Sequence, residues 1–101
     1  MVKKQDIYFT VTGLFRFDDT EFLKEGMKVR LEKEPDNDYD NEAIMVKLAG
    51  IGKIGYVANS VKSVVGDEAY SAGRLYDKFD NEAEGTILYN MGGALQCRFE
   101  G

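Results

Sequence analysis

Four carboxylates stand at every second position in one short segment of this chain. They are Asp36, Asp38, Asp40 and Glu42. Alternating carboxylates resemble the first half of a calcium-binding loop, and paired carboxylates also serve hydrolases as acid and base. The calcium interpretation fails, because a loop counted from Asp36 needs glycine at its sixth position and glutamate at its twelfth, where Asn41 and Lys47 stand. A polar turn also lacks the contrasting environments that separate the pKa values of a catalytic pair.

Other catalytic groups are scarce. The chain has no histidine and a single cysteine, Cys97, so the commonest general base and a disulfide are both excluded. Cys97 lies in an apolar alternating pattern typical of a small core residue. Glycines 50, 52 and 55 lack the spacing and the Gly-Lys-Ser/Thr ending of a phosphate loop. We therefore expect a protein that is not an enzyme and that has neither a cofactor nor a metal site.

The charge pattern leaves nucleic-acid binding open. The net charge of −5 opposes phosphate, but the segment 36–42 supplies four of the five excess negative charges, so the rest of the chain is nearly neutral. Twelve Phe and Tyr residues exceed what one small core holds comfortably, which predicts exposed rings that can stack on unpaired bases. Tyr39 is the best candidate, because it lies among acidic turn residues.

The elements that must position these residues are mostly strands. Residues 7–17 alternate β-branched and aromatic side chains, with an interruption at Gly13 that suggests a bulge or bend. A second strand starts after Gly26 and ends at Pro35. The remaining predicted strands are 43–48 and 53–57, joined as a hairpin by a glycine turn, and 85–89 and 94–99. Gly55, inside the fourth, indicates close approach of another backbone.

Two short helices complete the prediction. One is capped by Asn59 or Ser60 and ends near Gly66, and the other follows Ser71 with a stripe of Leu75, Tyr76 and Phe79, where a strand is the alternative. Short strands with glycine bends fit a mainly β fold with short helices, a small OB-like β-barrel of about six strands. A ferredoxin-like sandwich fits less well, since it needs two long amphipathic helices. We expect one domain over residues 1–101.

The chain carries no apolar run long enough to span a membrane and no signal-peptide pattern after Met1, so we expect a cytoplasmic protein without a membrane partner.

The segment 31–46 contains Glu-Pro-Asp-Asn-Asp-Tyr-Asp-Asn-Glu-Ala-Ile, and Lys-Ile-Gly-Tyr-Val follows at 53–57. In this order, after Val11-Thr12-Gly13, these motifs resemble the HIRAN domain over nearly the whole chain. The resemblance implies an OB-like barrel, a module often attached to helicase-like DNA remodelling enzymes. It also implies that this barrel captures the 3′ end of single-stranded DNA.

The same resemblance implies the site residues. Tyr39 would contact the terminal nucleotide, and the Asp40 carboxylate would accept a hydrogen bond from the free 3′ hydroxyl while repelling a continuing phosphate. Arg16 and Phe17 resemble a phosphate-contacting and a base-stacking residue, and Tyr89 resembles a further stacking aromatic; we expect all five on one rim. The segment before the second strand is two residues longer than in the family, so the choice among Phe15, Arg16 and Phe17 stays open. Asp38 replaces a proline and should weaken phosphate attraction.

The sequence thus predicts a non-enzymatic HIRAN domain that binds single-stranded DNA at its 3′ hydroxyl end in DNA repair or replication-related processing. Because no ATPase motif is present, remodelling would need a helicase or another DNA-processing protein as partner. The alternative is a protein-interaction or homo-oligomeric assembly module with the same fold and no DNA affinity. For Tyr39 and Asp40 themselves, the alternative is a structural turn in which Asp40 caps backbone amides.

Overall fold

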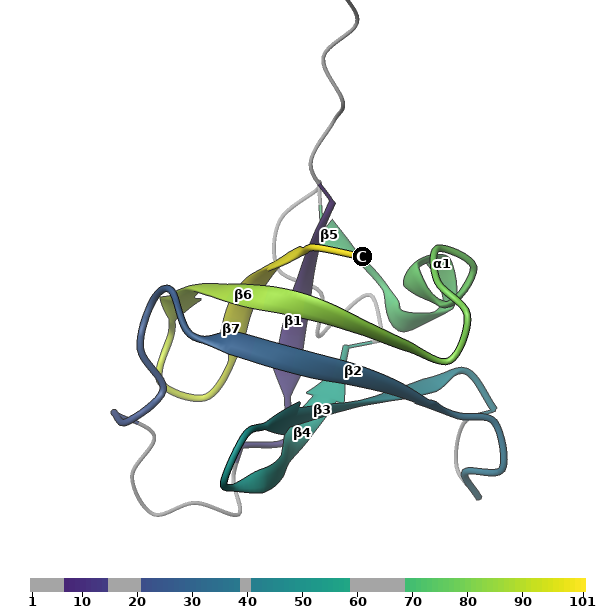
Figure 1. Cartoon of the computed structure of the whole chain (residues 1–101), viewed down its shortest axis with the longest axis horizontal. Coiled ribbons are helices and arrows are strands. Elements are labelled where there is room, and N and C mark those ends of the chain that lie inside the picture. Colours follow the sequence, from purple (N-terminus) through teal and green to yellow (C-terminus); the bar gives the residue numbers. More distant parts are fainter. Residues whose placement is uncertain (1–6, 15–20, 39–40, 59–68) are drawn as a thin grey trace, which may run out of the picture.

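The computed structural model of the chain describes residues 7–14, 21–38, 41–58 and 69–101. These residues form seven strands and one short helix (Figure 1). In chain order they are β1 (Tyr8–Thr12), β2 (Lys28–Glu34), β3 (Ala43–Leu48), β4 (Gly52–Val57), β5 (Ala69–Tyr70), α1 (Ala72–Tyr76), β6 (Glu82–Asn90) and β7 (Leu95–Phe99).

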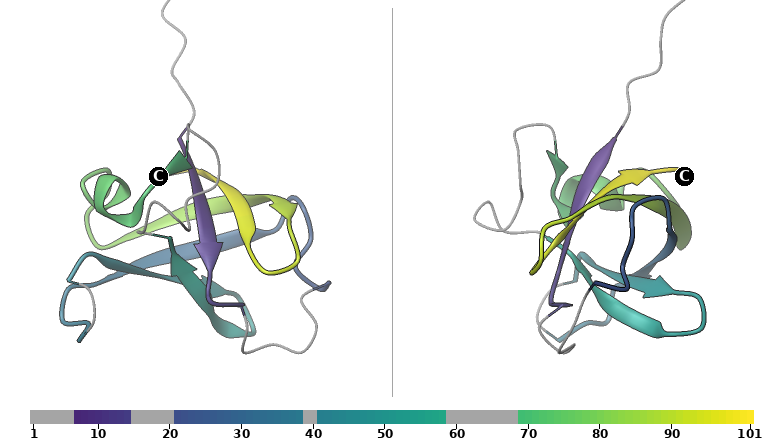
Figure 2. Two further views of the ribbon diagram at one scale, coloured as in Figure 1. Left: turned by 180° about the vertical axis from the view of Figure 1, so that it is seen from behind. Right: turned by 90° about the vertical axis from the view of Figure 1, so that its left-hand side faces the viewer.

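Six of the strands close into a barrel. The order is β4-β3-β2-β6-β7-β1, and β1 pairs with β4 to complete the ring. All of these pairs are antiparallel, and the two-residue β5 adds to β1 in parallel. The two further views in Figure 2 show β1 lying between β7 and β4, where it completes the ring. Closure removes the exposed edges that an open sheet would present.

The inward-facing side chains of the strands fill the barrel. On β2, Val29 and Leu31 are buried while Lys28 and Arg30 are exposed, as a strand with one wet face requires. β1 departs from strict alternation, because Thr10 is fully buried between Phe9 and Val11; its hydroxyl donates to Gln96 Oε1 at 2.9 Å. The largest fully buried side chains are Phe9, Leu14, Leu23, Leu31, Ile44, Ile54, Leu75, Ile87 and Leu95.

Gly55 makes the closure between β1 and β4 possible. A Cβ atom added there would collide with the carbonyl oxygen of Thr12 on β1. The close backbone approach predicted at Gly55 is therefore confirmed, and its partner is β1. Gly50 and Gly52 in the β3–β4 turn have φ angles of 84° and 92°, a region that residues with a Cβ rarely adopt.

Most predicted elements are confirmed. The second strand ends at Glu34, directly before Pro35, and the predicted hairpin is β3 and β4. The described first strand is shorter than predicted, since Gly13 has a φ of 82° and ends it after Thr12, while residues 15–17 lie outside the described residues. The sixth strand begins three residues earlier than predicted, at Glu82, because its register with β2 extends to Glu32.

The predicted helix after Ser71 is confirmed over only five residues, with Ser71 as its N-cap. Phe79 lies beyond its end and packs on Phe99, with 5.8 Å between the ring centroids. The helix predicted from Asn59 or Ser60 to Gly66 lies outside the described residues, and β5 was not predicted. The prediction of a mainly β fold, a small barrel of about six strands, is confirmed.

Candidate nucleic-acid interface

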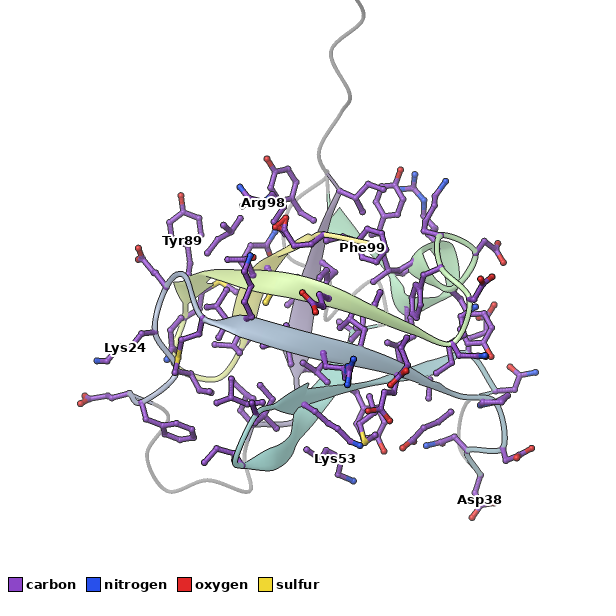
Figure 3. All side chains as sticks on the ribbon, in the orientation of Figure 1. Lys24, Asp38, Lys53, Tyr89, Arg98 and Phe99 are labelled. Carbon is purple, nitrogen blue, oxygen red and sulfur yellow. The ribbon has the colours of Figure 1, made fainter. Side chains whose placement is uncertain are left out.

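Only one of the five predicted site residues lies in the described part of the chain. Arg16, Phe17, Tyr39 and Asp40 fall outside it, as does Phe15. Tyr89 is described, and its side chain on β6 is 60% exposed. Figure 3 shows Tyr89 and Asp38, the described residue nearest to Tyr39, at opposite ends of the molecule. The structure therefore does not bring Tyr89 beside Asp38, and the joint site of all five residues stays a prediction.

The turn that leads to Tyr39 is held at Glu34, the last residue of β2. The Glu34 carboxylate accepts hydrogen bonds from the Tyr56 hydroxyl at 2.8 Å and from Asn37 Nδ2 at 3.1 Å. The Asn37 amide also donates to the Glu34 carbonyl oxygen at 3.1 Å. The acidic segment therefore starts as a closed turn fastened to β4 through Tyr56.

Tyr56 lies between the strands that adjoin the two predicted site segments. It pairs with Thr12 on β1, which leads to residues 15–17, and with Met45 on β3, which follows residues 39–40. Because β1 and β3 both run antiparallel to β4, they run in the same direction as each other. The chain therefore leaves Thr12 towards one end of these strands and reaches Met45 from the other end. The described flanks thus share Tyr56 as a neighbour without themselves converging.

Sequence reasoning did not include Tyr56 among the site residues. The available signal was its position three residues after the cation Lys53 in the Lys-Ile-Gly-Tyr-Val motif. The Lys53 ammonium lies 5.2 Å from the centre of the Tyr56 ring, within the range of a cation–π contact. Tyr56 therefore combines a hydroxyl that donates to Glu34 with a ring that faces the Lys53 ammonium.

Lys33, one residue before Glu34, joins α1 and the turn after it to this end of the barrel. Its ammonium donates to the Phe79 carbonyl oxygen at 2.6 Å and lies 4.2 Å from the centre of the Tyr76 ring. Its backbone amide donates to the Asn81 carbonyl oxygen. The start of α1 is fixed as well, because the Ala72 amide donates to the carbonyl oxygen of Ala58, just after β4. The helix and the acidic turn are therefore neighbours.

Four cations on the outer face of the sheet are paired with carboxylates. Four of the nine Lys and Arg residues in the described ranges form ion pairs, at 2.9 to 3.8 Å between nitrogen and oxygen. The pairs are Lys28–Glu100, Arg30–Glu82, Lys47–Glu32 and Arg98–Glu100. A carboxylate that already faces a cation reduces its attraction for phosphate. This face therefore offers little net positive charge to a nucleic-acid backbone.

Asn90, the residue after Tyr89, lines a groove at the other end of the barrel. The groove has a volume of about 550 Å³ and is lined by Glu21, Leu23, Lys24, Glu25, Asn90 and Gly92. Asn90 Nδ2 donates to the Leu23 carbonyl oxygen at 3.0 Å, which ties β6 to the segment before β2. Two carboxylates and one ammonium line the groove, so its charge does not favour phosphate.

The described residues offer little for covalent or metal chemistry. Cys97 is fully buried, and this burial raises the pKa of its thiol to about 12, so it stays protonated and a poor nucleophile near neutral pH. No cluster of three or more His, Cys, Asp or Glu residues suited to a metal ion occurs within these ranges. Nor does this part of the chain contain a helix long and apolar enough to cross a membrane.

The sequence matches the HIRAN domain family over residues 4–100, nearly its full length. The chain belongs to the HIRAN domain family. The crystal structure of the HIRAN domain of human HLTF has the same fold: the two superpose with a TM-score of 0.59 at 19% sequence identity, covering 93% of this chain and 74% of that one. No curated protein sequence matches the chain.

HIRAN domains are known as DNA-binding modules and are not themselves catalytic. Membership therefore assigns this chain to a family of nucleic-acid-binding domains, as its sequence predicted.

Proposed function

We propose that this HIRAN domain binds single-stranded DNA at its 3′ hydroxyl end, in DNA repair or replication-related processing. The observation that carries the proposal is the family match over residues 4–100, which includes the Tyr39-Asp40 pair in its family-like motif. Asp40 accepts a hydrogen bond from the terminal hydroxyl, and a carboxylate there repels the phosphate of a continuing strand. Tyr39 contacts the terminal nucleotide, and Arg16 and Phe17 contact phosphate and base.

Two features of the described residues support recognition of an end over sequence-independent binding along a strand. Four of the nine described Lys and Arg residues are in ion pairs on the sheet face, which reduces the positive charge there for a continuous phosphate backbone. The hydrogen bonds of Glu34 to Tyr56 and Asn37 hold the start of the acidic turn, which lowers the entropy cost of presenting the residues that follow. Remodelling of DNA would depend on a helicase or another DNA-processing partner.

Labelled oligonucleotides that end in a 3′ hydroxyl or a 3′ phosphate test the proposal, measured by fluorescence anisotropy at low salt. The wild type should prefer the hydroxyl end, and Asp40→Ala should remove the preference. Glu25→Ala is the control, because it deletes an exposed carboxylate in the groove at the other end of the barrel. Equal affinity of the wild type for both ends would contradict end recognition. Negligible affinity for both, with a mass that grows with protein concentration, would favour the assembly module instead.

A further inference from the structure

We infer that Arg74 and Lys78, held over the ring of Tyr70, form a second contact for DNA phosphates, 5′ of the captured end. The guanidinium carbon of Arg74 lies 4.0 Å from the centre of the Tyr70 ring, and the Lys78 ammonium lies 5.9 Å from the same centre. The inference rests on the proposed function and extends it from the last nucleotide to the path of the strand.

The backbone around α1 points both cations outward. Ala72 and Leu75 are the buried residues of the helix, while Arg74 and Lys78 are exposed. The Leu75 amide donates to the Ser71 carbonyl oxygen and the Lys78 amide to the Leu75 carbonyl oxygen, each at 2.9 Å. These bonds hold the spacing of the cations, so the arrangement does not depend on two free side chains meeting by chance.

The charge environment separates these cations from most others in the described ranges. Lys28, Arg30, Lys47 and Arg98 face carboxylates within 4 Å, whereas no ion pair to Arg74 or Lys78 occurs among the described residues. Asp77 and Asp80 are exposed nearby and lower the local potential without pairing with either cation. Two unpaired cations with acidic neighbours predict a contact that is weak and sensitive to salt.

The Tyr70 ring holds the Arg74 guanidinium in place before phosphate binds. A guanidinium held against an aromatic ring keeps its N–H donors available at its edge, and less side-chain entropy is lost when they bind. Because Arg74 covers the ring, Tyr70 supports a cation and is not itself a stacking platform for a base on that face.

The patch lies on the same side of the barrel as the acidic turn. Lys33 contacts Tyr76 and Phe79 and is followed directly by Glu34, so α1 adjoins the turn that leads to Tyr39. Figure 1 shows α1 and the β2–β3 turn at the same end of the molecule, away from the β6–β7 turn. A strand whose 3′ end lies at that turn therefore has α1 as a neighbouring surface for its 5′ phosphates.

Oligonucleotides of about three and about nine nucleotides with the same 3′ hydroxyl end test this contact, since the longer one reaches the OB-type site size. The wild type should bind the longer one more tightly, and the gain should vanish in the double variant Arg74→Gln, Lys78→Gln. For the longer oligonucleotide, the slope of log affinity against log salt should be smaller in the double variant than in the wild type by about 1.4, the value for two single-strand phosphate contacts. Lys24→Gln, at the far groove, is the control and should keep the gain. A nine-nucleotide strand whose linkages are uncharged methylphosphonates beyond the third nucleotide from the 3′ end should bind with the affinity of the short oligonucleotide.

Each other outcome overturns the inference. Binding that does not increase with length, or a gain that the double variant retains, would show that Arg74 and Lys78 do not contact the strand. Binding of an acidic peptide as tight as that of the longer oligonucleotide would show that Arg74 and Lys78 form a general anion-binding surface. Failure of the proposed function is distinguishable, because it appears as loss of the 3′ hydroxyl preference in the short oligonucleotide, where α1 is not reached.

Discussion

At the scale of single residues, the hydrogen bond from Tyr56 to Glu34 links the acidic turn to the barrel. We predict that Tyr56→Phe lowers the free energy of unfolding by about 1 kcal/mol, because the carboxylate loses a donor while the ring stays. Tyr76→Phe is the control, since no hydrogen bond to the Tyr76 hydroxyl occurs among the described residues. Urea unfolding measures both variants, and equal effects would show that the bond contributes nothing specific.

Cys97 gives a second prediction at this scale. Because burial raises its thiol pKa to about 12, the folded protein should not react with a disulfide reagent at pH 8, and the thiol should become reactive only in denaturant. The absorbance of the released thiolate follows the reaction. Fast reaction of the native protein would mean that β7 opens readily or that the thiol is accessible.

At the scale of elements, Glu100 joins the end of β7 to β6 and β2. Its carboxylate accepts from Arg98 Nε and from the Thr86 hydroxyl, each at 3.2 Å, and it lies 3.6 Å from the Lys28 ammonium. These contacts, that with Arg98 above all, lower the pKa of Glu100 below its ordinary value of 4.5. The depressed pKa means that the charged form stabilises the fold above the unfolded pKa and stops doing so as pH falls through the folded one.

We therefore predict that Glu100→Gln destabilises the protein at neutral pH, by no more than about 1 kcal/mol for a pair near the surface. The difference from the wild type should shrink towards zero as pH falls through the lowered pKa. Urea unfolding at several pH values measures it, with Glu25→Gln, an exposed glutamate of the far groove, as control. A difference that stays constant from neutral to strongly acidic pH would contradict the charge-based explanation.

At the scale of the whole molecule, closure of the barrel depends on Gly55. We predict that Gly55→Ala lowers the free energy of unfolding by about 2 kcal/mol or more, because the new methyl group meets the backbone of β1, which cannot move without opening the β1–β4 pair. Gly93→Ala is the control, since no atom lies within 4 Å of the added Cβ, and it should change stability by less than about 0.5 kcal/mol. Calorimetry compares the two, and similar unfolding temperatures would contradict the role of Gly55.

The sequence by itself determined the six strands of the barrel, most of their buried faces and the family. Alternation with a period of two is local, so the buried Val29 and Leu31 beside the exposed Lys28 and Arg30 could be predicted without knowing what they pack against. The Glu-Pro-Asp-Asn motif likewise predicted the family and its DNA-binding class.

Only the tertiary structure decided which distant residues meet. The pairing of β1 with β4, the bond between Tyr56 and Glu34 and the location of Tyr89 far from Asp38 each depend on how the ring closes. The cations gathered over Tyr70 depend on where α1 packs. These relations join residues that lie far apart in the chain or on different elements, and a pattern read within one strand carries no information about the register between strands.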